Sequence, residues 1–240
     1  LRSPYAHAKI ISIDTSKAEE LKGVKAIVTS TDFEDFPSEF VPNGEMVVNM
    51  KDITRNVMAR EKALYVGHTV AAVAATSEDI AEQALALIDV TYEVLPHVLE
   101  VEDAEKPGAP LLHDDMITIG IEPAPESASN VAKRVEFGFG DVEKGFSEAD
   151  LIIEREFTTQ QVHQGYIEPH ACLASVSEDG QAELWCTTQG PFVVRNFCSK
   201  LLGFNAAQIR VTASEIGGGF GGKTVVYLEP LALALSRKSC

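Results

Sequence analysis

The chain has 240 residues, of which 36 are acidic and 20 basic, and its formal net charge at pH 7 is −16. Nucleic-acid binding draws most of its affinity from Lys and Arg, so this balance argues against a DNA or RNA partner. Its longest apolar stretches fall far short of the ~20 residues of a membrane helix, and no basic start precedes an apolar signal core. We therefore expect a soluble, cytoplasmic globular protein.

The first hundred residues alternate between apolar patterns of strand and helix period, which predicts a compact α/β domain. Thr76 and Asp79 resemble a capping box in front of the second predicted helix. The predicted strands are 9–13, 24–29, 70–75 and 90–95, and the predicted helices are 16–21 and 78–88.

The composition changes between residues 104 and 130, where prolines cluster and favour extended, exposed backbone. This segment predicts a linker to a second domain. Pro191 suits the first turn of a helix in that domain, and Gly203 suits its C-terminal stop. The predicted strands are 131–137, 151–159, 172–176, 182–186 and 209–213, and the predicted helices are 191–202 and 225–236.

The strongest candidate for a ligand site is the segment 216–224, which reads Ile-Gly-Gly-Gly-Phe-Gly-Gly-Lys-Thr. Glycines let a bound group approach backbone N–H donors, and a glycine run before a helix aims those donors at an anion. The segment also satisfies the phosphate-binding signature G-x-x-x-x-G-K-[ST]. However, the residues after Thr224 leave no room for the strands and the acidic residue that a nucleotide hydrolase needs.

Six short segments occur in the order and at about the separations found in the xanthine dehydrogenase/aldehyde oxidase family. They are residues 1–10, 65–71, 90–96, 167–170, 188–189 and 217–223. The chain therefore resembles the N-terminal part of the molybdenum-binding subunit of that family. The resemblance implies an α+β fold with an α/β hammerhead domain over 1–103, a Pro-rich linker over 104–130, and an incomplete molybdopterin-binding domain over 131–240.

The resemblance also implies an oxidoreductase that hydroxylates an N-heterocycle, aldehyde or aryl substrate with water as the oxygen source. It implies a molybdopterin cofactor, such as Mo-pterin cytosine dinucleotide, with [2Fe–2S] and FAD on partner chains or domains. We therefore expect a hetero-oligomer with iron–sulfur and FAD subunits and the remaining molybdenum-domain chain. The family's general base matches no residue here and is expected beyond Cys240, so this chain alone is expected to be inactive.

Three positions carry the expected cofactor contacts. Gln189 lies between a predicted strand and a predicted helix, where a side chain points out of the sheet end, and its amide both donates and accepts hydrogen bonds. The resemblance implies that this amide hydrogen-bonds an oxygen ligand of molybdenum. It also implies that the main-chain N–H groups of Phe220 and Gly221, with Gly219 beside them, meet the pterin cofactor and an oxygen of its metal.

Thr224 is the substrate-side candidate, because purine hydroxylases of the family often carry a glutamate at this position. Threonine cannot supply that charge, which puts purine recognition by this route in doubt. Lys223 fits either a phosphate contact or a solvated position at a helix start.

Two further features suggest metal chemistry but do not match its signatures. His163, Glu168 and His170 could bind zinc in principle, but their spacing fits no metal signature. We expect residues 167–170 to line the approach to the cofactor instead. The cysteines form no C-x-x-C pair and are expected to be free thiols. Besides the phosphate-binding loop, a non-catalytic assembly module stays open as an alternative.

Overall fold

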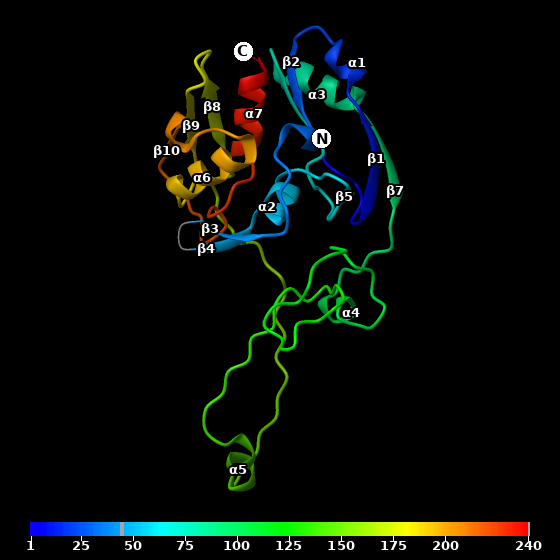
Figure 1. The fold of residues 1–240 in the computed structure, drawn as a ribbon, viewed down its shortest axis with the longest axis vertical. Coiled ribbons are helices and arrows are strands. Elements are labelled where there is room, and N and C mark those ends of the chain that lie inside the picture. The colour runs from blue at the N-terminus through cyan, green and yellow to red at the C-terminus, as the bar shows by residue number, and fades with distance from the viewer. Residues whose placement is uncertain (44–45, 240) are drawn as a thin grey trace. The chain divides into compact units, whose positions relative to one another are not determined.

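The computed structural model describes residues 1–43 and 46–239, which fall into two compact units (Figure 1). The first unit combines Leu1–Leu95 with Gln164–Cys240, and the second comprises Pro96–His163. None of the helices in the described residues is long and apolar enough to cross a membrane.

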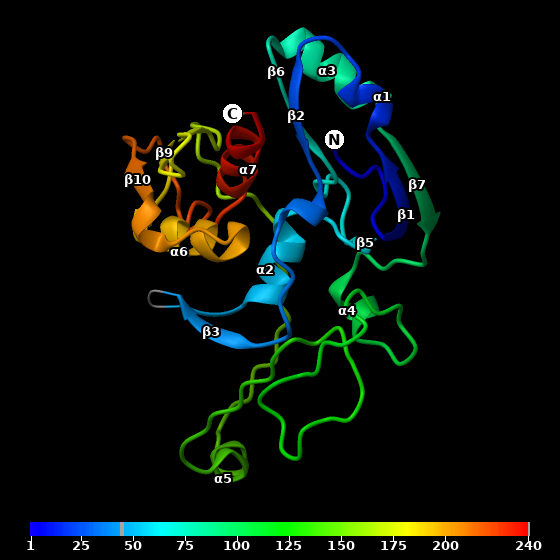
Figure 2. The same cartoon turned by 45° about the horizontal axis from the view of Figure 1, so that its top comes forward.

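The N-terminal part of the first unit is built on antiparallel strand pairs, with β1 central in a sheet of order β5-β1-β7, β2 paired with β6, and β3 with β4. Two helices, α1 and α3, contact each other, and α3 lies against β6 (Figure 2). These elements confirm the predicted alternation of strands and helices. The bounds are β1 (Ala8–Asp14), α1 (Ser16–Glu19), β2 (Val24–Val28), η1 (Ser30–Asp32), β3 (Phe40–Asn43), β4 (Met46–Asn49), α2 (Met50–Val57), β5 (Lys62–Ala63), β6 (Ala72–Ala75), α3 (Glu78–Leu87) and β7 (Asp89–Val94).

The N-cap of α3 is Ser77 and not Thr76, so the predicted capping box is wrong by one residue. Ser77 has extended backbone, and its hydroxyl oxygen accepts the N–H of Ile80 at 3.3 Å. Thr76 follows β6 instead, where its N–H donates to the carbonyl of Gly23 at 2.8 Å. That bond fixes Thr76 at the end of β6 and leaves the next residue to begin the helix.

The C-terminal part of the first unit contains a βαβ arrangement, in which β9 and β10 run parallel and are connected through α6. Strand β8 pairs antiparallel with β9 on the other side. Helix α6 has its predicted bounds, and Gly203 ends it in the left-handed region with φ of 68°. The bounds are β8 (Cys172–Val176), β9 (Ala182–Cys186), α6 (Pro191–Leu202), η2 (Ala206–Gln208), β10 (Ile209–Ala213) and α7 (Glu229–Ser239).

Helix α7 begins at Glu229, later than the predicted start at residue 225. The segment before it bends instead, and the N–H of Tyr227 donates to the carboxylate of Glu229 at 2.9 Å. This bond satisfies one donor just ahead of the helix. The glycine segment therefore does not lead straight into a helix, contrary to the sequence-based expectation.

A continuous hydrophobic core joins both parts of the first unit. Helix α7 lies against β8 and also against β2, as Figure 1 shows. Val28 and Met58 from the N-terminal part share this core with Leu184, Phe197 and Leu233 from the C-terminal part. The site described below therefore stands on a packed scaffold.

The second unit contains two short helices, α4 (Val101–Ala104) and α5 (Val142–Ser147). The strands predicted at 131–137 and 151–159 do not form, and this prediction is wrong. Within the described residues these segments make a single isolated bridge, between Ile119 and Lys133. Alternating apolar residues qualify a segment as a strand only if another strand pairs with it, and here Phe137 and Phe157 are exposed.

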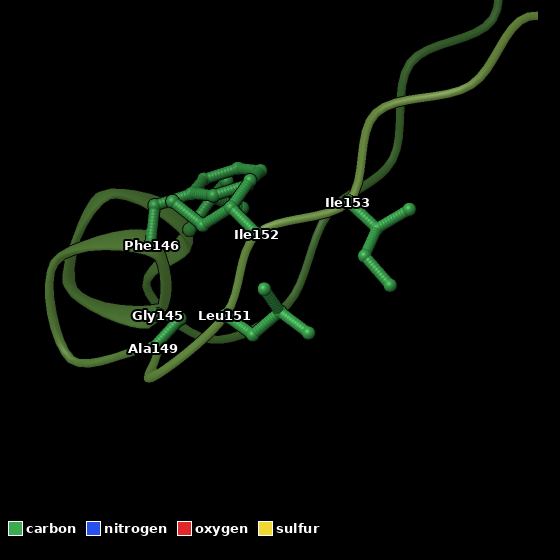
Figure 3. Close-up of a pocket in the computed structure, with 7 residues that line it drawn as sticks. Gly145, Phe146, Ala149, Leu151, Ile152 and Ile153 are labelled. Carbon is green, nitrogen blue, oxygen red and sulfur yellow. The ribbon is translucent and has the colours of Figure 1, made fainter.

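Apolar side chains of the second unit gather around a pocket of about 290 Å³ beside α5 (Figure 3). Phe146 comes from the helix, and Leu151, Ile152 and Ile153 come from the segment that follows it. All four side chains are largely exposed.

Candidate functional site

Two loops meet at the carboxyl ends of the parallel strands β9 and β10. Gln189 follows β9, and the glycine segment follows β10, whose last residue Ala213 is in register with Cys186 of β9. The main-chain N–H of Gln189 donates to the carbonyl of Lys223 at 2.9 Å. Ligands of open α/β sheets commonly bind at this end of the strands. The structure therefore brings the predicted residues Gln189, Gly219, Phe220 and Gly221 together.

The side-chain amide of Gln189 is oriented by two main-chain donors. Its oxygen Oε1 accepts the N–H of Gly221 at 3.0 Å and the N–H of Lys223 at 3.3 Å. Because an amide nitrogen cannot accept these bonds, the oxygen must face the loop and the NH₂ group remains a donor.

The turn around Phe220 has an unusual backbone. Phe220 has a φ of 48°, and Gly221 follows with a φ of 90°. The N–H of Gly222 closes the turn on the carbonyl of Gly219 at 2.7 Å. None of the hydrogen bonds found among residues 1–43 and 46–239 uses the N–H of Phe220. Phe220 is 73% exposed.

Three glycines of the segment let neighbouring side chains approach closely. A Cβ at Gly219 would lie 2.5 Å from Oε1 of Gln189, and one at Gly222 would lie 2.7 Å from the ring of Tyr166. A Cβ at Gly217 would lie 2.7 Å from the Cβ of Glu168. By contrast, a Cβ at Gly221 would meet no atom within 4 Å. The loop is therefore packed on both sides but open at Gly221.

Lys223 is neither solvated nor placed to reach a phosphate, so both sequence-based interpretations of it are wrong. Its side chain is fully buried, and Nζ lies 2.8 Å from the carboxylate oxygen Oε2 of Glu168. Nζ also donates to the main-chain carbonyl of Glu168 at 2.9 Å. The lysine of a phosphate-binding loop must face the bound phosphates. Here the ammonium of Lys223 is paired with the carboxylate of Glu168 instead. This pairing disfavours the alternative of a nucleotide-binding phosphate loop.

Tyr166 and Tyr227 belong to the same neighbourhood, and the sequence analysis missed both. The Tyr166 ring lies 4.8 Å from Nζ of Lys223, and its hydroxyl is 2.9 Å from Nε2 of His170. The His170 and Tyr227 rings meet edge to face at 4.9 Å. Only their positions in the sequence could have indicated them, because Tyr166 precedes the segment 167–170 and Tyr227 follows the segment 216–224.

The described residues hold no group of three His, Cys, Asp or Glu side chains placed to hold a metal ion. Glu168 is engaged elsewhere. Its pKa is lowered because Lys223 hydrogen-bonds the carboxylate and, second, because the N–H of Gly217 donates to it at 2.7 Å.

Thr224 lies beside the turn, and its hydroxyl donates to the carbonyl of Gly221 at 2.9 Å. The side chain is half-buried. The hydroxyl proton of Thr224 is therefore used in a hydrogen bond within the loop, while its oxygen can still accept a hydrogen bond.

The cysteines Cys172, Cys186 and Cys198 are free thiols, as predicted, and Cys240 lies outside the described residues. Cys172 and Cys186 are cross-strand partners in the β8–β9 pair. Burial raises the pKa of both thiols to about 12, with the nearby carboxylate of Glu229 contributing in the same direction. Both thiols therefore stay protonated near neutral pH.

Two family models match the chain. Residues 1–96 match the aldehyde oxidase and xanthine dehydrogenase a/b hammerhead domain, and residues 124–239 match the molybdopterin cofactor-binding domain. The chain is 34% identical over 254 residues to the probable hypoxanthine oxidase XdhD of Escherichia coli, covering 95% of this chain and 26% of that protein. It is also 34% identical over 233 residues to the carbon monoxide dehydrogenase large chain of Afipia carboxidovorans, covering 95% of this chain and 28% of that protein.

The fold agrees with these sequence matches. Quinoline 2-oxidoreductase from Pseudomonas putida 86 superimposes with a TM-score of 0.81 and 29% identity, covering 99% of this chain and 29% of that protein. The matches define a hammerhead domain followed by molybdopterin-binding sequence, which confirms the predicted α+β fold class. The chain belongs to the xanthine dehydrogenase and aldehyde oxidase family of molybdenum-binding proteins, and it spans between a quarter and a third of these relatives.

Proposed function

We propose that this chain forms one wall of the molybdopterin site of a molybdenum hydroxylase. In the complete enzyme the substrate is an N-heterocycle, an aldehyde or an aryl compound, and water is the source of oxygen. The observation that carries the proposal is the orientation of the Gln189 amide. Its oxygen is held by two main-chain N–H groups, which presents its NH₂ group as a fixed donor.

The residues at the turn fit a group rich in oxygen acceptors. Gln189 contributes side-chain N–H donors, and Phe220 contributes a main-chain N–H that no other described group accepts. Gly221 leaves open space in front of the turn. A role for the Gly221 N–H itself is not supported, because it already donates to Gln189. We therefore assign the cofactor contacts to Gln189 and the Phe220 main chain. Gly221 gives access to them, and Gly219 lets the Gln189 side chain approach the loop.

When bound, the molybdenum centre activates water and takes up the electrons of the oxidised substrate. The residues of this chain orient that centre and limit which substrates reach it. Glu168 does not serve as the general base, because Lys223 and the Gly217 N–H hold its pKa below the usual range. A base near neutral pH needs a raised carboxylate pKa. The proposed base therefore comes from outside these residues.

The substrate class follows from Thr224. The Thr224 hydroxyl can accept a hydrogen bond but carries no charge. It therefore suits a neutral polar substrate better than a substrate that must be bound by a carboxylate. An aldehyde or a neutral N-heterocycle fits this description. [2Fe–2S] and FAD groups on partner chains or domains would accept the electrons. The name of one relative, the carbon monoxide dehydrogenase large chain, supports an assembly of more than one chain.

The test is Gln189→Ala in the holoenzyme, with Gln208→Ala as a matched control. Gln208 also accepts a main-chain N–H, from Asn205 at 2.9 Å, but it caps η2 away from the glycine loop. We expect the Gln189 variant to slow turnover of an aldehyde and heterocycle panel by roughly 10² to 10³, the effect of one lost donor at such a site. The control variant keeps turnover. Molybdenum content per chain is measured in both proteins.

Unchanged turnover of the Gln189 variant at full molybdenum content would remove this residue from the site. If the complete wild-type enzyme purifies without molybdenum and pterin, the proposed function itself is overturned.

A further inference from the structure

The pair formed by Glu168 and Lys223 ties the two ends of the glycine loop together. The oxygen Oε2 of Glu168 accepts the N–H of Gly217 at 2.7 Å, at the start of the loop. The same oxygen lies 2.8 Å from Nζ of Lys223, at the end of the loop. One carboxylate oxygen therefore holds both ends of the segment 217–223.

The ammonium of Lys223 is held on several sides. It donates to the carboxylate and to the main-chain carbonyl of Glu168, and the ring of Tyr166 lies 4.8 Å away. The lysine side chain is fully buried, and that of Glu168 is 30% exposed. Removing one partner of a buried ion pair leaves an uncompensated charge and is strongly unfavourable. The pair is therefore hard to separate while the loop keeps this shape.

The loop needs such a restraint because its central turn is strained. Phe220 has left-handed backbone with a φ of 48°, which side chains with a Cβ rarely adopt. Strained backbone persists only where the surroundings determine it. Here the segment 166–168 packs against Gly217 and Gly222 on one side, and Gln189 packs against Gly219 on the other.

We propose that Glu168 and Lys223 are positioning residues, which fix the glycine loop so that the Phe220 N–H and the Gln189 amide face the cofactor. Gln189 depends directly on this arrangement, because its amide oxygen is oriented by the N–H of Lys223 itself at 3.3 Å. Neither Glu168 nor Lys223 is assigned a contact with the cofactor. The proposal rests on the proposed function of this site.

The test compares Lys223→Met, Glu168→Gln and the double variant in the holoenzyme. Methionine retains much of the length of the lysine stem without its charge, and glutamine retains the shape of glutamate. The matched control is Arg210→Met, which breaks a surface pair between Arg210 and Glu183 whose atoms lie 3.7 Å apart and whose arginine is 77% exposed. Surface pairs of this kind contribute little.

Three readouts separate positioning from general destabilisation. Amide hydrogen exchange by mass spectrometry follows peptides that cover 216–224 and, for comparison, peptides of α6. Molybdenum retained per chain is measured after dialysis, and the electron paramagnetic resonance spectrum of the remaining molybdenum is normalised to its content. In both single variants we expect at least about tenfold faster exchange in 216–224 alone, loss of molybdenum and an altered spectrum. Glu168→Gln leaves the buried ammonium of Lys223 without its carboxylate, and Lys223→Met removes the contact that joins the end of the loop to Glu168. The control should match the wild type on all three.

The double variant tests whether the pair acts as a unit. Its loop exchange should be no faster than that of Lys223→Met, since the interaction is already lost in the single variant. Unchanged exchange and unchanged molybdenum in both single variants would overturn the proposal, and so would equal acceleration in α6, which would make the pair a general stability element. If the wild type holds no molybdenum, the proposed function fails, but the exchange experiment still decides whether the pair fixes the loop.

Discussion

A single methyl group at Gly219 tests the site at its tightest contact. In Gly219→Ala the new Cβ would lie 2.5 Å from Oε1 and 2.8 Å from Cδ of Gln189, closer than real Cβ contacts. Gly219 is not among the residues with left-handed backbone, so the methyl group itself is the perturbation. The atoms that it meets are at the far end of a flexible side chain. We therefore expect the Gln189 amide to swing away.

The expected magnitudes differ for stability and activity. Displacing the amide breaks the two hydrogen bonds that it accepts from Gly221 and Lys223, at about 1 kcal/mol each and thus about 2 kcal/mol in total. The same displacement removes the donor assigned to the cofactor, which lowers turnover by roughly 10² to 10³. The variant should therefore fold normally and lose most of its activity.

The assay combines thermal unfolding, molybdenum content and turnover in the holoenzyme. The matched control is Gly145→Ala in α5, where an added Cβ meets no atom within 4 Å. That control should keep activity and gain a little stability, because alanine favours a helix over glycine. In a protein that already carries Gln189→Ala, adding Gly219→Ala should lower turnover little further, because the side chain that the new methyl group would displace is absent. Wild-type turnover and molybdenum content in Gly219→Ala would refute the reasoning.

Two further predictions follow from the pKa shifts. The pKa of Glu168 is lowered from 4.5, first by Lys223 and then by the Gly217 N–H, so the ionised carboxylate stabilises the fold fully above pH 4.5 and less as the pH falls through the lower, folded pKa. The difference in melting temperature between wild type and Glu168→Gln should therefore shrink below pH 4.5. A constant difference down to pH 2 would contradict this. With pKa values of about 12, Cys172 and Cys186 hold about one thiolate in 10⁴ at pH 8. Iodoacetamide should label them within minutes only after urea unfolding, and mass spectrometry would detect any rapid native labelling that contradicts this.

Local signals predicted an element well where the residues at its ends mark its bounds. Helix α6 begins at Pro191 and ends at Leu202 as predicted, because proline at the first turn and Gly203 after the last turn are both local rules. The segments 131–137 and 151–159 also contain apolar residues typical of strands, but a strand forms only against another strand, and the sequence pattern does not identify that partner. Phe137 and Phe157 are accordingly exposed at 91% and 87%.

The site divides in the same way. The family resemblance places Gln189 and the glycine segment together at the cofactor, and in the structure both follow the carboxyl ends of the parallel strands β9 and β10. The partner of Lys223 could not be predicted from the sequence, because Glu168 lies 55 residues earlier and outside any helix or strand. The letters Gly-Lys-Thr permit a phosphate contact only if the ammonium faces outward. Burial of Lys223 beside the carboxylate of Glu168 removes the possibility of a phosphate contact and makes the lysine a structural part of the loop. The same sequence motif therefore allows nucleotide binding or molybdopterin binding, and the contact made by the lysine side chain favours the second.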